Sequence, residues 1–356
     1  MTTDTVQTAV IGVTGYAGAE LARLLLKHPR LHGKPPVFAG RVDEKDAARG
    51  GIPLIEIHPQ LGGSNGNADL KQEQFSWELL ENRGVEVLFL ATPHEQSRGW
   101  APEALKRGIR VIDLSGAWRL VDPANRAVYA FEDENSGLAA QTQAQAVYGM
   151  PELYRAQIAD AKLVANPGCY STSVILPLRP LVAAGLVDLE AGIVADSKSG
   201  VSGAGKAPTA KTHYMYAADN LSAYAVFAHR HTGELLEQIG LKASEIVFTP
   251  HLIPIPRGIL STIYVRFKEP QTHASVARVY HEFFANSPMV RIYAKGLPQI
   301  QYSVRTNYAD IGFQLDASGH RAVIVSCLDN LLKGAAGQAV QNLNVMSGWP
   351  ESEGLE

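Results

Sequence analysis

The feature that most constrains the fold lies near the N-terminus, where a short apolar strand meets evenly spaced glycines and then a helix. Residues 9–13 are largely apolar, the glycines follow a GxxGxxG spacing, and a helical pattern continues to Leu26. Such a turn brings backbone N–H groups and a helix N-terminus close to a pyrophosphate. The pattern predicts a dinucleotide site, with a plain tight turn as the alternative. Its residues are Gly12, Thr14, Gly15, Tyr16 and Gly18.

Further apolar segments alternate with helical patterns in the N-terminal half. Strands are predicted at residues 36–40, 85–91 and 110–114. Continuous apolar runs are typical of parallel strands that are covered on both faces. Residues 43–67 are polar and rich in glycine and proline, so we expect them to lie outside the sheet. This half is therefore predicted to be an α/β domain with a parallel sheet.

An arginine indicates which dinucleotide the site accepts. Arg41 follows the strand at residues 36–40, where an NAD-preferring site carries an acidic residue for the ribose 2′-hydroxyl. A guanidinium can instead pair with a 2′-phosphate, which predicts NADP(H). Asp43 and Glu44 follow closely, so an ordinary surface arginine stays the alternative.

Three polar residues follow the next two strands. His94 comes after the strand at residues 85–91, and Ser115 and Arg119 come after the strand at residues 110–114. Ligands of open α/β sheets bind at the carboxyl ends of the strands. We expect Arg119 to bind a substrate phosphate or carboxylate, because its guanidinium matches either group. Ser115 is assigned to the cofactor, and His94 is expected to be structural or to line the cofactor site.

A cysteine stands at the predicted start of a helix. Residues 163–165 end a strand, Asn-Pro-Gly forms a turn, and Cys169 opens an apolar helix. The unpaired N–H groups and the helix dipole at such a position favour a thiolate. Gly168 is expected to leave room for an incoming carbonyl, and the N–H groups after the turn to hold an oxyanion. The pattern favours a nucleophile over an inert packed thiol.

Two later segments are candidates for the rest of the site. A strand at residues 192–197 leads into a loop rich in glycine and serine, residues 198–206, whose backbone is expected to lie close to a ligand. A second strand, beginning at Tyr224, is expected to end in two histidines, with Thr232 capping the helix that follows. His229 or His231 is therefore a candidate acid/base for a cysteine nucleophile.

The C-terminal part is predicted to be mainly structural. Strands are expected at residues 246–248, 259–267 and 321–327, and a helix of small residues is expected from Asp329. His251 is ranked below the other two histidines, and Cys327 is expected to be a packed thiol.

Composition excludes several classes of function. The chain has 356 residues, enough for two domains, and a formal net charge of -3, with both signs spread along the chain. This balance favours neither a nucleic acid nor an anionic membrane as partner. No apolar run is long enough for a membrane span and no secretory signal is visible, so a cytoplasmic location is expected. The spacing of the two cysteines supports neither a disulfide framework nor a metal site.

Seven motifs, in order along nearly the whole chain, resemble those of one family. The chain is similar to N-acetyl-γ-glutamyl-phosphate reductases and, more distantly, to aspartate-semialdehyde dehydrogenases. The motifs are GxxGYxG at 12–18, DLSGAWRL at 113–120, YGMPEL at 148–153, NPGCYST at 166–172, SGVSGAGK at 199–206, HRHTGE at 229–234 and DNLLKGAAGQA at 329–339.

The resemblance implies a Rossmann-type doubly wound sheet and an inserted α+β domain with a mixed sheet. The implied NADP-binding domain covers residues 1–168 and is completed by a C-terminal helix at 329–356. The substrate and oligomerisation domain covers 169–328, and a homodimer or homotetramer is expected. Cys169 becomes the nucleophile and His231 the acid/base, with His229 left open. The remaining implied residues are Ser202, Lys206 and His229 for the substrate, and Gly203, Gly205 and Asn330 for the cofactor.

The implied reaction is the NADPH-dependent reduction of an acyl phosphate to an aldehyde in arginine synthesis, through a thioester. Two alternatives stay open. A reductase of the longer aminoadipyl phosphate in lysine synthesis would share every catalytic motif. A non-catalytic NADP-sensing regulator would have no need of the cysteine.

Overall fold

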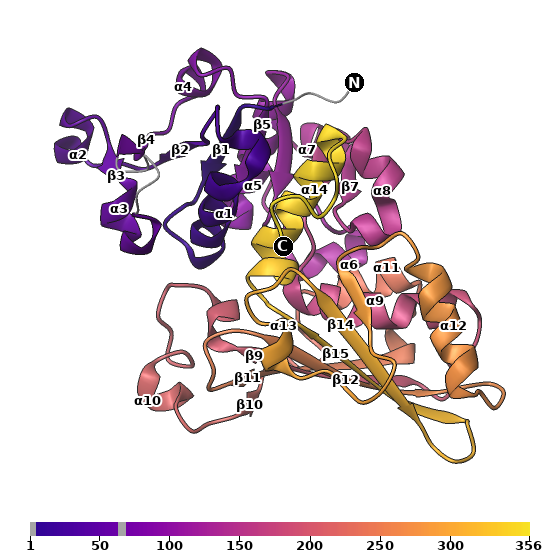
Figure 1. Cartoon of the computed structure of the whole chain (residues 1–356). Helices are drawn as coiled ribbons and strands as arrows, with labels where there is room; N and C mark the ends of the chain where they lie inside the picture. The colour runs from indigo at the N-terminus through magenta and orange to yellow at the C-terminus, as the bar shows by residue number, and fades with distance from the viewer. Residues whose placement is uncertain (1–4, 63–68) are drawn as a thin grey trace. The chain divides into compact units, whose positions relative to one another are not determined.

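The computed structural model describes residues 5–62 and 69–356 and divides into two compact units (Figure 1). The first unit comprises Met1–Arg119, Glu132–Asn166 and Ala336–Glu356. The second comprises Leu120–Phe131 and Pro167–Ala335. Within residues 5–62 and 69–356, no helix combines the length and the apolar character needed to cross a bilayer.

The first unit is built around one sheet. Its strand order is β3-β4-β2-β1-β5-β6-β8-β7, and every pair is parallel except β3 with β4. The order reverses between β1 and β5, which is the switch point where doubly wound sheets bind ligands. The strands are β1 (Thr8–Ile11), β2 (Val37–Gly40), β3 (Ile52–Pro53), β4 (Lys71–Gln74), β5 (Val87–Leu90), β6 (Arg110–Asp113), β7 (Ala146–Tyr148) and β8 (Leu163–Ala165).

Helices cover both faces of this sheet. One set of alternate strand residues, such as Ile11 and Val111, packs with Ala101 and Ala104 of α5. The other set, such as Val10 and Ile112, is also fully buried, and α1 and α14 contact that part of the sheet. Figure 1 shows α14 beside α1, although the two are distant in sequence. The helices are α1 (Tyr16–Lys27), α2 (Glu44–Ala48), α3 (Leu54–Ile57), α4 (Trp77–Asn82), α5 (His94–Lys106), α7 (Ser136–Gln143), α8 (Pro151–Ala159) and α14 (Gly337–Ser347).

The polar segment after β2 differs from its prediction. It contains α2, β3, α3 and a short turn at Pro59–Leu61, and β3 joins the sheet through β4. Residues 63–67 of that segment lie outside the described residues. Strand β4 was not predicted because its sequence, Lys-Gln-Glu-Gln, is wholly polar. Pairing with β2 and β3 therefore outweighs the low strand propensity of these residues.

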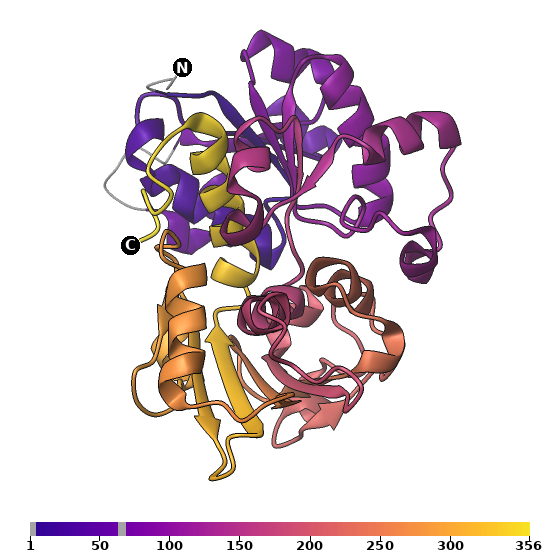
Figure 2. The same ribbon diagram turned by 90° about the vertical axis from the view of Figure 1, so that its right-hand side faces the viewer.

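The second unit holds a mixed sheet with its longer helices on one face (Figure 2). Its order is β10-β11-β9-β12-β15-β14-β13, and α9 contacts β12, β14 and β15. On the other face, Val194 pairs with Val247 and Tyr264, and all three side chains are exposed. The strands are β9 (Ile193–Gly200), β10 (Ser222–Ala223), β11 (Ile246–Ile253), β12 (Ile259–Arg266), β13 (Val290–Ile292), β14 (Ala309–Leu315) and β15 (Arg321–Leu328). The helices are α6 (Pro123–Arg126), α9 (Cys169–Ala183), α10 (Tyr214–Ala217), α11 (Thr232–Ile239), α12 (His273–Phe283) and α13 (Ile300–Ser303).

Four local predictions in this unit need correction. The strand predicted from Tyr224 to the histidines is wrong, because Ala225 and Phe227 have left-handed φ angles of 47° and 59°, which no strand accepts. Thr232 is the first residue of α11 and not its cap, which is His231. Strand β9 runs on to Gly200, through the first residues of the predicted loop. The helix expected from Asp329 begins instead with a π-helical turn at Leu332–Ala336.

Candidate active site

The predicted glycine turn joins β1 to α1 in the first unit. A Cβ on Gly12, which has φ of 94°, would lie 2.3 Å from the carbonyl oxygen of Ala91, and one on Gly18 would lie 2.1 Å from that of Gly12. Close packing of β1, α1 and the end of β5 therefore requires these two glycines. A Cβ on Gly15 would have only an ordinary contact at 3.6 Å, so protein packing does not explain this glycine. Its position at the N-cap of α1 suits a pyrophosphate.

The rest of the predicted cofactor site is also in the first unit. Arg41 is exposed directly after β2, and its guanidinium has no hydrogen bond or ion pair among residues 5–62 and 69–356. The neighbouring Asp43 is engaged as the N-cap of α2. Ser115 donates its hydroxyl to Asp113, 2.8 Å away, and burial raises the pKa of that carboxyl. Thr14 lies in the glycine turn, and Tyr16, the first residue of α1, is 42 % exposed.

Arg119 is less available than its prediction requires. The side chain is buried, with Nε donating to the carbonyl of Asn166 at 2.7 Å and Nη2 donating to that of Leu114 at 2.8 Å. These bonds fasten the loop after β6 to the end of the neighbouring strand β8. In this conformation a phosphate would have to compete with both carbonyls for the guanidinium.

Cys169 is the first residue of α9 in the second unit, as predicted. Its N-cap is Gly168, and the thiol-bearing residue is partly exposed. The π-helical turn after β15 packs against it, since a Cβ on Gly334 would lie 2.7 Å from the Cβ of Cys169. The thiol therefore combines a helix N-terminus with access from solvent, the setting in which cysteine thiolates react.

His231 packs directly on the glycine that precedes the cysteine. A Cβ on Gly168 would lie 2.5 Å from Nε2 of His231, so the lack of a side chain at Gly168 makes room for the histidine ring. The prediction that this space is left for an incoming carbonyl is therefore wrong. Glu234 is fully buried beside them, accepting from the N–H of Gly168 at 3.0 Å and lying 4.0 Å from Nε2 of His231. One carboxylate thus holds the turn before Cys169 and faces the histidine.

Replacement of Gly168 by alanine is expected to lower turnover about 100-fold, because the new methyl group must displace the His231 ring. The backbone of Gly168, with φ of -72° and ψ of 148°, accepts alanine without strain, so the effect is local. Steady-state rates and a thermal melt measure the two properties separately. Gly99→Ala is the control, because nothing lies within 4 Å of its added Cβ. A G168A enzyme with the wild-type rate would contradict this role of the ring.

His229 lies in an aromatic cage beside His231. The two imidazole centroids are 4.6 Å apart, and Tyr170, Tyr224 and Phe248 each lie edge-on to His229 at 5.5 Å. Burial, with a smaller effect of the Arg230 charge, lowers the pKa of His229 to about 4. The ring is therefore neutral near pH 7. Its Nδ1 accepts from the backbone N–H of His231 at 3.1 Å.

The cage tyrosines, Tyr170 and Tyr224, line the same cavity as Cys169. Tyr170 donates its hydroxyl to the carbonyl of His251 at 2.7 Å, and burial raises the pKa of Tyr170 above its ordinary value. Burial likewise raises the pKa of Tyr224 to about 12. Both phenols are therefore neutral at physiological pH, and they line the cavity as hydrogen-bonding groups. The ring of His251 faces Asp196, at 3.1 Å, so this histidine contributes to the cage through its carbonyl.

A cavity of about 410 Å³ brings several of the predicted residues together. This volume is typical of small-molecule sites. The predicted residues Cys169, Gly203, His229 and His231 line it. Its other lining residues are Val128, Tyr170, Ala204, Thr209, Lys211, Thr212, Tyr224, Ala225, Ala228, Arg230 and Leu252.

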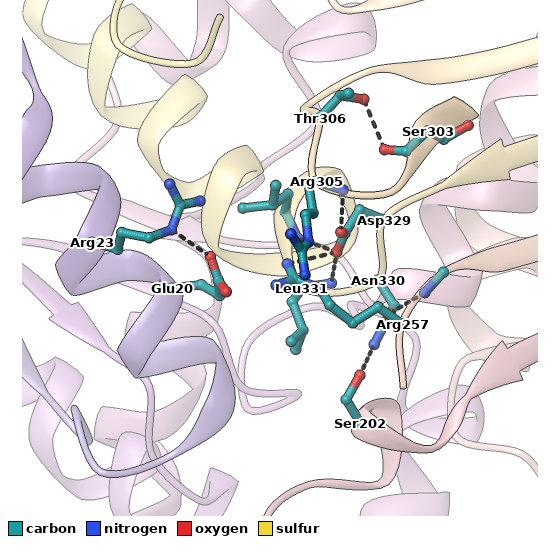
Figure 3. Close-up of polar contacts among 12 residues, drawn as sticks. Glu20, Arg23, Ser202, Arg257, Ser303, Arg305, Thr306, Asp329, Asn330 and Leu331 are labelled. Carbon is teal, nitrogen blue, oxygen red and sulfur yellow. Dashed lines mark hydrogen bonds and ion pairs between the residues drawn. The ribbon is translucent and has the colours of Figure 1, made fainter. Parts of the chain in front are cut away.

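Ser202 and Asn330 lie outside the cavity lining and belong to a polar network (Figure 3). Asn330 is buried, donates to the hydroxyl of Ser202 at 2.9 Å and accepts from the N–H of Gly258 at 2.7 Å. The adjacent Asp329 is bound by Arg257 at 3.0 Å and by the N–H of Arg305 at 2.7 Å. These bonds fix the short turn at Val201–Ala204, whose Gly203 reaches the cavity.

The remaining predicted residues occupy varied positions. Gly205 has φ of 89° with open space at its Cβ position, and Lys206 is exposed and lies outside the cavity lining. His94 opens α5 and lies 2.9 Å from Glu95. Cys327 is fully buried and burial raises the pKa of its thiol to about 12, which confirms the packed thiol.

The sequence reasoning missed several residues of this site. Glu234 stands three residues after His231, a spacing that puts both on one face of a helix, so this signal was available. His58, in the polar segment after β2, is buried with Nε2 at 2.7 Å from the carbonyl of Val13 in the glycine turn. Lys211 comes from a segment without periodicity, which gave no signal, and Tyr224 was predicted only as the start of a strand.

Two family models match the chain. The semialdehyde dehydrogenase NAD binding domain matches residues 7–161, and the semialdehyde dehydrogenase dimerisation domain matches residues 169–330. Solved structures of the same fold include aspartate semialdehyde dehydrogenase II of Vibrio cholerae, with a TM-score of 0.68, 18 % identity, and coverage of 96 % of this chain and 98 % of that one. The enzyme of Candida albicans, solved with NADP, has a TM-score of 0.66 and 15 % identity at the same coverage.

Curated relatives cover almost the full length. N-acetyl-gamma-glutamyl-phosphate reductase of Dehalococcoides mccartyi strain CBDB1 is 43 % identical over 98 % of this chain and 97 % of its own length. The reductases of the same name from Pelotomaculum thermopropionicum and Methanococcus maripaludis strain C5 are 41 % and 40 % identical at the same coverage. A partly exposed cysteine stands at the start of α9, beside a buried histidine and a buried glutamate. Because its full-length relatives and both family models agree, the chain belongs to the N-acetyl-gamma-glutamyl-phosphate reductase family of semialdehyde dehydrogenases.

Proposed function

We propose that this chain reduces N-acetyl-L-glutamyl 5-phosphate to N-acetyl-L-glutamate 5-semialdehyde and phosphate in arginine biosynthesis, with NADPH as reductant. The observation that carries the proposal is Cys169 at the start of α9, sharing one cavity with His231. A covalent nucleophile divides a difficult reduction into an acyl transfer and a hydride transfer. The relatives that cover nearly the whole chain carry the name of this activity.

The sulfur of Cys169 attacks the 5-carbonyl carbon, and the bond to the phosphate oxygen breaks as phosphate leaves with the electron pair. The product is a thioester on Cys169. NADPH, when bound, supplies the hydride that reduces this thioester to a thiohemiacetal. His231 donates the proton that completes the thiohemiacetal hydroxyl and accepts it back as the C–S bond breaks, so that the aldehyde and the thiolate of Cys169 are released. Glu234 fixes the position of the turn at Gly168 and faces the His231 ring.

The dinucleotide is assigned to the first unit. Gly12, Thr14, Gly15, Tyr16 and Gly18 would hold the pyrophosphate at the start of α1, and the exposed guanidinium of Arg41 would select the 2′-phosphate. Ser115 of this unit keeps its assignment to the cofactor site, and the assignment of Gly203, Gly205 and Asn330, which belong to the second unit, stays a prediction from the sequence. Gly15, whose missing side chain serves no protein contact, is the best support for this fit.

Substrate phosphate remains assigned to Arg119. Of the other residues assigned to the substrate, His229 lines the cavity, whereas Ser202 and Lys206 lie outside its lining. For Arg119 this assignment requires the guanidinium to exchange at least one carbonyl partner for the phosphate.

The reverse reaction tests the proposal directly. With N-acetylglutamate 5-semialdehyde and NADP, NADPH should form only when inorganic phosphate is present, because the thioester needs an acceptor. The one-carbon-longer aminoadipate semialdehyde serves as the comparison substrate, and we expect a much lower kcat/KM for it. Rapid turnover of the longer substrate alone would assign the chain to the lysine pathway, and no turnover of either would leave a non-catalytic NADP-binding protein.

We also propose that the protein works in the cytoplasm as a homodimer or homotetramer. The match of the dimerisation domain to residues 169–330 supports self-association. Val194 and its two cross-strand partners, Val247 and Tyr264, are exposed and supply an apolar area on the sheet face opposite α9.

A further inference from the structure

The cavity beside Cys169 carries an unbalanced positive charge. Lys211 and Arg230 both line it, and no aspartate or glutamate stands among its lining residues. Both cations are exposed, and neither side chain has a hydrogen bond or ion pair within the described part of the chain. Arg230 lies between the two histidines in sequence, and its charge helps to lower the pKa of His229, so that charge acts inside the site.

The rest of the lining suits an uncharged chain. Val128, Ala204, Ala225, Ala228 and Leu252 supply small or aliphatic side chains around the same space. An elongated ligand with an uncharged body, one anionic group and a reactive carbonyl at Cys169 matches this distribution of charge. The N-acetylglutamyl chain has this form, with its α-carboxylate as the permanent anion.

The chemistry requires an anchor that stays in place. Once phosphate has left, the acyl group is held by the thioester bond and by whatever binds its far end, and the α-carboxylate is its only remaining charge. We propose that Arg230, assisted by Lys211, binds the α-carboxylate of the N-acetylglutamyl chain in this cavity. A guanidinium can hold a carboxylate through two parallel hydrogen bonds, and a second cation nearby strengthens the pair. This inference rests on the proposed function.

The test compares two aldehydes in the reverse reaction. One is N-acetylglutamate 5-semialdehyde, and the other is 4-acetamidobutanal, which is the same molecule without the α-carboxylate. For R230Q we expect kcat/KM to fall about 10- to 100-fold with the first aldehyde and less than about 3-fold with the second. K211Q should show a smaller effect of the same pattern. R230K should recover part of the loss, because it restores the charge but not the two-pronged geometry.

Arg278→Gln provides the matched control, since this arginine is 71 % exposed on α12, outside the cavity lining. It should behave as wild type with both aldehydes. An equal loss with both aldehydes in R230Q would mean that Arg230 does not contact the carboxylate, and a rise confined to the KM of phosphate would make it a phosphate ligand. Either result overturns the inference. Failure of the wild-type enzyme to oxidise the semialdehyde would instead overturn the proposed function.

Discussion

Cys169→Ser is expected to lower turnover by roughly 10³-fold or more while NADPH binding stays within about twofold of wild type. A serine hydroxyl has nearly the size of the thiol but is not ionised near neutral pH, so it cannot attack the acyl phosphate without a strong base. We expect cofactor binding to be unaffected, because Cys169 begins α9 in the second unit, whereas the glycine turn assigned to the cofactor lies in the first.

Phosphate-dependent reduction of NADP measures the rate, and a fluorescence titration measures NADPH affinity. Cys327→Ala is the matched control, since this thiol is fully buried in β15 and lies outside the cavity. We expect it to lower the melting temperature but to keep kcat. A C169S enzyme that turns over at the wild-type rate would remove the thioester from the account.

His231→Asn should cost about 10²- to 10⁴-fold in kcat, the usual range for loss of a general acid or base. His229→Asn should cost much less, because a pKa of about 4 leaves His229 neutral and unable to supply a proton at assay pH. His229 takes up a proton only as the pH falls through about 4, so it contributes no ionisation between pH 5 and pH 8.

The pH dependence separates the two histidines further. Any inflection in the pH profile of kcat/KM between pH 5 and pH 8 should persist in H229N and change in H231N. Circular dichroism and melting curves show whether either variant has lost its fold. If H229N were the slower enzyme and also lost the pH profile, the acid/base role would pass to His229.

Local sequence signals predicted the features that depend on neighbours in the chain. The glycine turn after β1 and the start of α9 at Cys169 were predicted because glycine spacing and an Asn-Pro-Gly turn act over a few residues. The continuous apolar strands also indicated a sheet buried on both faces. The fold class followed from these, together with the resemblance of seven motifs to one family.

Features set by contacts between distant segments could not be predicted in this way. The left-handed backbone at Ala225 and Phe227, directly after the cage residue Tyr224, is a conformation that no local propensity indicates. Arg119 appeared to be an open oxyanion ligand because the sequence gives no sign of the two carbonyls that hold it. The role of Gly168 was assigned to the substrate, because the position of the His231 ring depends on the folding of α11 against α9.

Acylation of Cys169 without cofactor tests the central claim most directly. The enzyme would be mixed with freshly prepared N-acetylglutamyl phosphate, quenched in acid, and analysed by peptide mass spectrometry. We predict one N-acetylglutamyl group per chain, located on Cys169, removable by hydroxylamine, absent from Cys327 and absent from C169S. An unmodified Cys169 after full release of phosphate, or the same adduct in C169S, would contradict the covalent mechanism.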